Sequence, residues 1–294
     1  AGRDWPDGRF TPEIAQALVA TGRARYLYLA GRDWPDGRFM PEIAQALAKT
    51  RDAKHLYLAG RDWSDGRFDE AIVHALVETG DAKYLYLAGR DWPDRRFSKA
   101  ITKALIKTKY AYYLYLSGKE WPRKRFNKAI TQSLVKTMGL DDIYLAGLDW
   151  PDERFDKTLA YALVKAKYAH YIYLAGRDWP AGRFVEAMTQ ALLEIGDPQY
   201  LYLAGRDWPD ECYSDEIRKA LIRSGNANLL YLAGLSWPAR RYTDDILQAL
   251  ININILEYLH LARSRWPAER VSDALAEALR ESGGTKAYFF TTID

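Results

Sequence analysis

A tryptophan recurs every 29 residues along the whole chain, and this spacing constrains the fold more than any other feature of the sequence. The ten copies, which are all the tryptophans in the 294 residues, are Trp5, Trp34, Trp63, Trp92, Trp121, Trp150, Trp179, Trp208, Trp237 and Trp266. A fixed period of this length is typical of stacked supersecondary units, none of which can bury its apolar face alone. We therefore predict a single repeat domain over residues 1–294, made of ten 29-residue units with incomplete first and last units.

One segment of each unit has clear helical signals. Ile43, Ala46 and Leu47 lie at i, i+3 and i+4, which places them on one face of a helix. Residues that can cap a helix N-terminus precede this segment in many units, as at Thr11, Ser98, Asn127, Asp156, Ser214, Thr243 and Ser272. A glycine, such as Gly80, follows its end and tolerates the left-handed conformation in which helices often terminate.

The Tyr-Leu-Tyr-Leu segment that precedes each tryptophan fits two secondary structures. With a period of 3.6 residues, Leu56, Tyr57, Gly60 and Trp63 share one helical face. With a period of two, Leu56 and Leu58 point inward from a short strand. The first alternative gives an all-α solenoid of ten 29-residue helical hairpins, which we favour, and the second gives an α/β horseshoe.

Two residue types bear on this choice. Asp197-Pro198 favours a helix, because an N-cap followed by proline is a helix start signal and a poor start for an interior strand. Glycine in the Gly60 column costs about 1 kcal/mol inside a helix. The helical alternative therefore requires a close helix crossing at that glycine.

In its organisation the chain resembles tetratricopeptide-like helix-pair solenoids. It is also similar to ribonuclease-inhibitor-type leucine-rich repeats, which would imply the horseshoe. The matching residues of that second resemblance are Ala53, Leu56, Leu58, Phe68, Ile72, Ala75 and Leu76. No unit has the asparagine that the leucine-rich family places three residues after its second strand leucine.

The recurring Arg-Asp-Trp-Pro block is predicted to be structural. A catalytic constellation is needed once, whereas a structural device is needed in every unit. We expect the tryptophans to fill the core between units and Asp33 to cap a helix or pair with an arginine of its own or the adjacent unit. We expect Arg38 to lie over an aromatic face.

No pattern in the sequence points to catalysis, a cofactor or a metal. The four histidines occupy different columns or distant units, and none has a second ligand at metal-binding spacing. Cys212 stands where the other nine units have arginine and has no histidine near it in sequence. No phosphate-binding glycine loop is present. We therefore predict that the protein is not an enzyme and takes no cofactor.

Positive charge is concentrated between Arg95 and Lys136. This segment holds twelve Lys or Arg and one acidic residue, although the whole chain has a net charge of only +3. Tyrosines alternate with the basic residues, as an anionic strand or an acidic protein surface would require. The candidate binding residues are Lys103, Lys107, Tyr112, Tyr113, Lys119, Arg123, Lys124, Arg125 and Lys128.

These features predict a non-catalytic binding scaffold that presents an extended repeat surface to a protein or peptide. One alternative is a nucleic-acid-binding solenoid that uses residues 95–136, and another is a structural array that assembles end to end. No apolar run is long enough for a membrane span, so we expect no membrane partner.

The first helical segment supports the array alternative. Ile14, Ala17 and Leu18 match interior units, so this edge looks uncapped and predicts self-association. The chain begins inside a unit at Ala1 and lacks an initial methionine, and we expect that its native N-terminus has been trimmed. The single cysteine and the lack of a visible leader favour a cytoplasmic protein.

Overall fold

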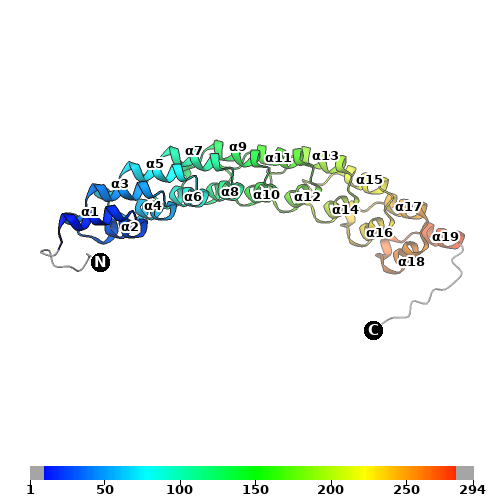
Figure 1. Ribbon diagram of the computed structural model, residues 1–294. Coiled ribbons are helices and arrows are strands. Elements are labelled where there is room, and N and C mark those ends of the chain that lie inside the picture. Colours follow the sequence, from blue (N-terminus) through cyan, green and yellow to red (C-terminus); the bar gives the residue numbers. More distant parts are fainter. Residues whose placement is uncertain (1–9, 283–294) are drawn as a thin grey trace, which may run out of the picture. The chain divides into compact units, whose positions relative to one another are not determined.

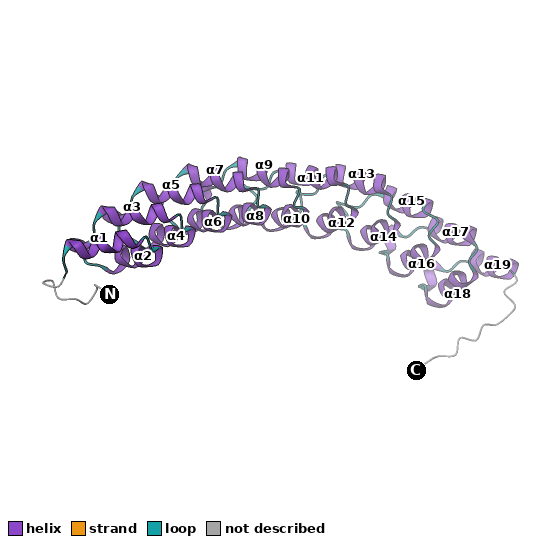
Figure 2. Ribbon diagram, viewed as in Figure 1, coloured by secondary structure: helices purple, strands orange, loops and turns teal. Residues whose placement is uncertain are grey.

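The computed structural model describes residues 10–282, and every regular element in that range is an α-helix or a short 3-10 helix (Figure 2). The all-α solenoid of paired helices is therefore confirmed. The α/β horseshoe is wrong, because the Tyr-Leu-Tyr-Leu segments are helical in every described unit. Trp5 lies outside the described residues, and so do residues 288–293, whose sequence favours a strand.

The chain forms two compact units, residues 1–158 and 159–294. In the first unit the odd-numbered helices form one layer and the even-numbered helices form a second layer (Figure 1). The ten helices of this unit are α1 (Pro12–Thr21), α2 (Ala24–Asp33), α3 (Pro41–Thr50), α4 (Ala53–Asp62), α5 (Glu70–Thr79), α6 (Ala82–Asp91), α7 (Lys99–Thr108), α8 (Ala111–Glu120), α9 (Lys128–Thr137) and α10 (Leu140–Asp149). Within this compact unit, three 3-10 turns connect successive 29-residue repeats. They are η2 (Asp36–Arg38), η3 (Asp65–Arg67) and η4 (Arg123–Arg125).

The second unit has the same two layers. Its helices are α11 (Thr158–Ala166), which begins at the boundary, α12 (Ala169–Asp178), α13 (Glu186–Ile195), α14 (Pro198–Asp207), α15 (Asp215–Arg223), α16 (Ala227–Ser236), α17 (Asp244–Ile253), α18 (Leu256–Arg265) and α19 (Asp273–Glu281). Its 3-10 turns are η5 (Ala239–Arg241) and η6 (Ala268–Arg270). A single repeat domain over residues 1–294 stays a prediction.

The local sequence signals explain where the helices begin and end. Asp52 and Asp81 accept hydrogen bonds from backbone amides in the first turns of α4 and α6. Ser98 does the same for α7, whereas Thr11 makes no side-chain cap. Gly80 ends α5 in the left-handed conformation with φ of 65°. Five non-glycine residues adopt this conformation in other units, namely Arg51, Lys109, Met138, Lys167 and Asn254.

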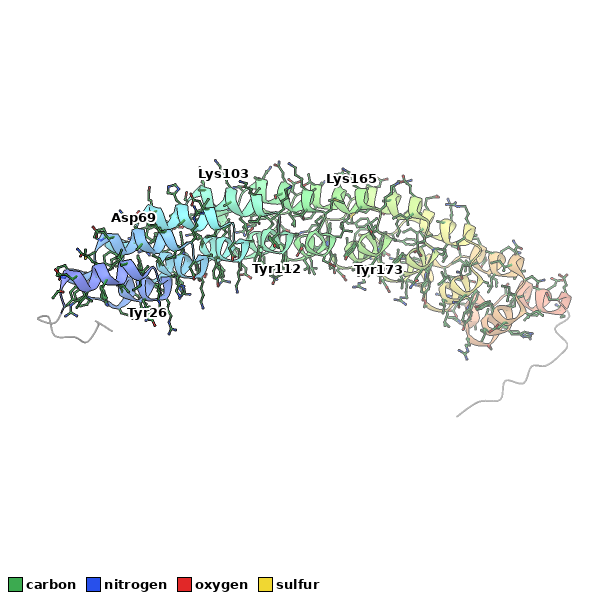
Figure 3. The ribbon with its side chains drawn as sticks, viewed as in Figure 1. Tyr26, Asp69, Lys103, Tyr112, Lys165 and Tyr173 are labelled. Atoms are coloured by element: carbon green, nitrogen blue, oxygen red, sulfur yellow. The ribbon has the colours of Figure 1, made fainter. Side chains whose placement is uncertain are left out.

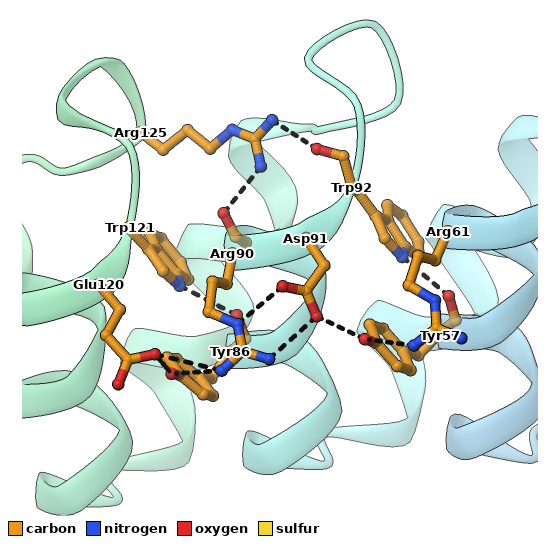
Figure 4. A network of polar contacts seen from close by, with 10 residues as sticks. Tyr57, Arg61, Tyr86, Arg90, Asp91, Trp92, Glu120, Trp121 and Arg125 are labelled. Carbon is orange, nitrogen blue, oxygen red and sulfur yellow. Dashed lines mark hydrogen bonds and ion pairs between the residues drawn. The ribbon is translucent and has the colours of Figure 1, made fainter.

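The tryptophans join successive units, as Trp121 illustrates. Its indole is 1% exposed and its Nε1 donates a hydrogen bond of 3.0 Å to the backbone carbonyl of Tyr86 in the preceding even helix (Figure 4). The edge of Phe97 meets the indole at a centroid distance of 5.8 Å. A large aromatic that is both buried and hydrogen-bonded is a strong contribution to packing. The predicted core role of the tryptophans is confirmed for the described copies.

The even helices carry a glycine at the position of Gly60 because the tryptophan indole of the next repeat occupies the space that a side chain would need. A Cβ added to Gly118 would lie 2.1 Å from Cε2 of Trp150, and one added to Gly89 would lie 2.1 Å from Cζ2 of Trp121. Both glycines are buried near the ends of their helices. The close approach predicted for this column therefore joins a helix and an indole, and not two helix backbones.

We expect Gly118→Ala to destabilise the protein, although alanine is the better helix former. The added methyl must displace the Trp150 indole, and overpacking of this kind costs about 1–3 kcal/mol. The measurement is the free energy of unfolding in urea, followed by circular dichroism. Gly66→Ala is the matched control, because a Cβ at Gly66 meets nothing within 4 Å. Equal effects of the two substitutions would contradict the role given to the indole.

Candidate binding surfaces

A ladder of tyrosine, basic and acidic side chains runs along the even-helix layer. Tyr57 donates a hydrogen bond of 2.5 Å to Asp91 of the next unit. Arg61 donates to Asp62 at 2.6 Å. The Arg61 guanidinium carbon lies 5.4 Å from the centre of the Tyr57 ring (Figure 4). Tyrosine–carboxylate bonds of the same kind are Tyr28–Asp62, Tyr86–Glu120, Tyr115–Asp149 and Tyr173–Asp207. The ladder confirms the expected Arg–Asp pairing and compensates most charges on this layer locally.

The ladder shifts the pKa values of its members in opposite directions. Burial and the hydrogen bond to Glu120 raise the pKa of the Tyr86 hydroxyl to about 12. The same hydrogen bond, with the one from Arg90, holds the pKa of the Glu120 carboxyl below its ordinary value. Tyr86 therefore stays neutral and Glu120 stays charged at neutral pH, so the donor and acceptor roles in this bond are fixed.

A leucine recurs on the even-helix layer of each compact unit, and we call this set the leucine row. One leucine occupies the same place on each of the nine even helices described, and all nine side chains are half-buried. They are Leu29, Leu58, Leu87, Leu116, Leu145, Leu174, Leu203, Leu232 and Leu261. Leu58 was predicted only as a residue of the alternative strand, so the leucine row was not predicted from the sequence. The available signal was an identical apolar residue in every unit at a position off the predicted helical face.

Tyrosines flank the leucine row. Tyr112 on α8 is 55% exposed and its ring lies 5.4 Å from that of Tyr113. Tyr113 in turn lies 5.8 Å from Tyr86 of the preceding unit. Tyrosine has a rigid apolar face and a polar tip, which suits contact with another molecule. In the first unit the even-helix layer therefore presents apolar, aromatic and compensated charged groups together.

The odd-helix layer of the first unit presents a different chemistry at α7 and α9. Five lysines on these two helices are exposed, and none forms an ion pair with another residue of the described chain. They are Lys99, Lys103, Lys107, Lys128 and Lys136, and we call this set the lysine face. Lys103 projects from the outer edge of the odd layer in Figure 3, on the side opposite Tyr112.

The structure divides the predicted basic and aromatic patch between two layers. Lys103, Lys107 and Lys128 belong to the odd helices. Tyr112, Tyr113 and Lys119 belong to α8 in the even layer. Residues i and i+29 are brought together by the repeat, whereas residues half a unit apart lie in opposite layers. The alternation of lysine and tyrosine along the sequence therefore does not produce one continuous patch.

The 3-10 turn between the layers accounts for the remaining predicted residues. Arg123 and Lys124 are exposed, and Lys124 forms an ion pair with Asp94. Lys119, on the helix before the turn, is paired with Asp149 at 2.7 Å. These two lysines already have acidic neighbours, unlike the lysine face.

The prediction that Arg125 contributes to a surface patch is wrong. Its side chain is 5% exposed, and its guanidinium donates to the carbonyls of Gly89 at 2.8 Å and Trp92 at 2.6 Å (Figure 4). The guanidinium carbon also lies 4.8 Å from the centre of the Phe97 ring. The arginine at the position of Arg125 thus links its repeat to carbonyl groups at the end of the even helix of the preceding repeat. We call this arrangement the arginine clamp.

The arginine clamp recurs with one substitution. Equivalent bonds to a glycine and a tryptophan carbonyl are made by Arg67, Arg96, Arg154, Arg241 and Arg270. Cys212 replaces the arginine in one repeat of the second compact unit, residues 159–294, and is 8% exposed. Burial, with a smaller effect of Glu211, raises the pKa of its thiol to about 11, so Cys212 is a poor thiolate at neutral pH.

Comparison of the chain with protein-family models, with curated proteins and with solved structures finds no match. Over residues 10–282, no three His, Cys, Asp or Glu side chains are grouped so that they could hold a metal ion. None of the helices in that range combines the length and apolar character required to cross a lipid bilayer. Evidence for a function therefore has to come from the surfaces of the even-helix layer and the odd-helix layer.

We expect Cys212→Arg to stabilise the protein by about 1–2 kcal/mol, because a guanidinium there would reach the carbonyls of Gly176 and Trp179. Arg154 makes both bonds although Arg123, and not a carboxylate, stands at the position equivalent to Asp94. The measurement is the free energy of unfolding in urea. Cys212→Ser serves as the control and should give no gain. A lower stability for Cys212→Arg would show that the local packing cannot accept the clamp.

We expect Tyr86→Phe to raise the pKa of the Glu120 carboxyl, because the hydrogen bond that contributes most to its low value is removed. A depressed carboxyl pKa stabilises the fold above the unfolded value, and this stability is lost as the pH falls through the folded value. The variant should therefore lose less stability on acidification below about pH 4.3, the ordinary Glu pKa, than the parent does. Carbon NMR titration of Glu120 measures the shift. Tyr84→Phe removes a hydroxyl that forms no hydrogen bond within the described residues, and it should leave the Glu120 pKa unchanged.

Proposed function

We propose that this protein is a non-catalytic scaffold that binds a protein or peptide partner across the even-helix layer. The observation that carries the proposal is the half-buried leucine that recurs on every described even helix, in the first and in the second compact unit. Each stands at the same place in its unit while the buried positions beside it, such as Leu56 and Tyr57, already fill the core. An apolar residue repeated at a position that the core does not require favours contact with another molecule.

The groups beside the leucines support a peptide or protein as the partner. Arg61 and Asp62 form an ion pair at the edge of the row, so the layer offers charged hydrogen-bonding groups without a large net charge. Tyrosine and arginine are the residue types most enriched at the energetic centres of protein interfaces. Burial of the leucines would supply about 25 cal/mol for each Å² of apolar surface removed from water.

The nucleic-acid alternative is less well supported than a protein or peptide partner. It depends on lysines and tyrosines that act together, and Lys103 and Tyr112 lie in opposite layers (Figure 3). Stacking of bases on aromatic side chains is a main source of affinity for single strands. A surface with lysines alone lacks that contribution.

End-to-end assembly stays a second candidate because of the first helix. Ile14 and Leu18 on α1 are half-buried, whereas their interior equivalents Ile43 and Leu47 are 0% exposed. The apolar face of α1 is therefore less well covered than that of α3. An edge of this kind can meet an identical or a different surface of a second copy.

The test is selection of binders from a displayed library of random peptides, followed by measurement of their affinity for variants. We expect Leu58→Lys, Leu87→Lys and Leu116→Lys together to weaken the selected peptides by about tenfold or more, because three apolar contacts are lost. The control is Gln45→Lys, His74→Lys and Gln132→Lys, which adds the same number of lysines to exposed sites of the odd layer.

Thermal unfolding of both triple variants establishes that each remains folded. Peptides that lose affinity equally for the two variants, or a library that yields no binder, would contradict the proposal.

A further inference from the structure

We propose that the lysine face of α7 and α9 is a second binding surface, whose ligand is a carboxylate-rich amphipathic helix of another protein. This surface lies on the odd-helix layer, opposite the leucine row. The inference therefore stands independently of the function proposed for the even layer.

The repeat fixes the spacing of the lysines. Lys99, Lys103 and Lys107 follow one another at four-residue steps, so they lie along one edge of α7, about 6 Å apart at their Cβ atoms. Lys128 and Lys136 occupy the equivalent first and last places on α9, which packs beside α7. Neighbouring helix axes are about 8–10 Å apart. The five amines therefore form a two-row array.

The array carries an energetic cost that the fold does not relieve. Like charges at i and i+4 of a helix destabilise it, and the lysine face has no acidic partner in the described chain. Some basic residues of the first unit have acidic neighbours, as Asp149 accompanies Lys119 and Asp94 accompanies Lys124. The lysine face differs because five unpaired lysines are gathered on two adjacent helices, where carboxylates of a partner would compensate the concentrated positive charge.

A groove beside the lysines identifies the shape of that partner. It has a volume of about 620 Å³ and lies between α5 and α7. Val77, Ala100 and Ala104 give it an apolar floor, and Lys103 and Lys107 stand at its side. Glu78, which also lines it, is already paired with Arg51 at 3.0 Å. Apolar anchors with carboxylates at i and i+4 are the pattern of an amphipathic helix in a groove.

The composition of this face favours a protein ligand over a nucleic acid. Neither α7, with the sequence KAITKALIKT, nor α9, with KAITQSLVKT, contains an aromatic residue. Single-stranded nucleic acids depend on aromatic side chains for much of their affinity. The small residues of the groove floor instead accept an aliphatic side chain.

The test uses three probes with the full chain. The first is a synthetic amphipathic helix with glutamates at i and i+4 beside a leucine stripe, the second is its glutamine counterpart, and the third is single-stranded oligothymidine. We expect only the glutamate peptide to bind, with an affinity that falls as salt is added. Fluorescence anisotropy at several salt concentrations gives the dissociation constants.

Two variants locate the site. Lys99→Gln, Lys103→Gln and Lys107→Gln together should weaken the glutamate peptide by about tenfold or more, because three ion pairs are lost. Arg25→Gln, Lys54→Gln and Lys83→Gln remove the same charge from exposed sites of the even layer and should have little effect. Ala104→Gln fills the groove without a change of charge and should also weaken the peptide.

Each remaining outcome overturns the proposal. Oligothymidine that binds as tightly as the peptide, with the same lysine dependence, would identify a nucleic-acid surface. Equal losses in the two charge variants would indicate a general electrostatic effect. No binding of the peptide at low salt would show that the lysine face is solvated only. Circular dichroism of every variant confirms that a lost signal is not lost folding.

Discussion

The structure depends on one contact, in which a tryptophan indole lies against a glycine in the even helix of the preceding repeat. The described residues show it at Trp63, Trp92, Trp121, Trp150, Trp208, Trp237 and Trp266. Trp121 shows its three parts, since it is buried, donates to the carbonyl of Tyr86 and fills the space where a side chain at Gly89 would be. Buried polar groups need a partner, so the indole N–H and the carbonyl satisfy each other. The arginine clamp adds two charge-assisted bonds across the same junction, as Arg125 does to Gly89 and Trp92.

This junction explains why the surfaces of the protein are so regular. Each repeat packs on its neighbours through the same contacts, so the same positions of every repeat face the solvent. The tyrosine ladder and the leucine row follow from this regular packing of the even helices. Departures from the pattern are then informative, because the fold does not require them. The uncompensated lysines of α7 and α9 and the replacement of an arginine by Cys212 are two such departures.

The sequence favoured paired helices over the strand alternative, but it did not predict which side chains share a surface. Helix caps at Asp52 and Ser98 and the left-handed terminus at Gly80 are local, so the residues themselves specify them. The face to which a charged residue contributes is not local. Arg125 and Lys124 are adjacent in sequence, yet the first is buried against backbone carbonyls and the second is exposed.

The sequence by itself determined the period, the core tryptophans, the pairing of arginine with aspartate and the preference for paired helices, because each follows from a pattern repeated every 29 residues. Only the tertiary structure decided that lysines and tyrosines of the basic segment occupy opposite layers, and that an identical leucine in every described repeat lies half-buried beside the tyrosines. The physical reason is that residues close in sequence can belong to either helix of a hairpin, whereas the packing places these two helices in separate layers. A surface is assembled from residues one unit apart, and the orientation of each helix about its axis decides which of them reach solvent.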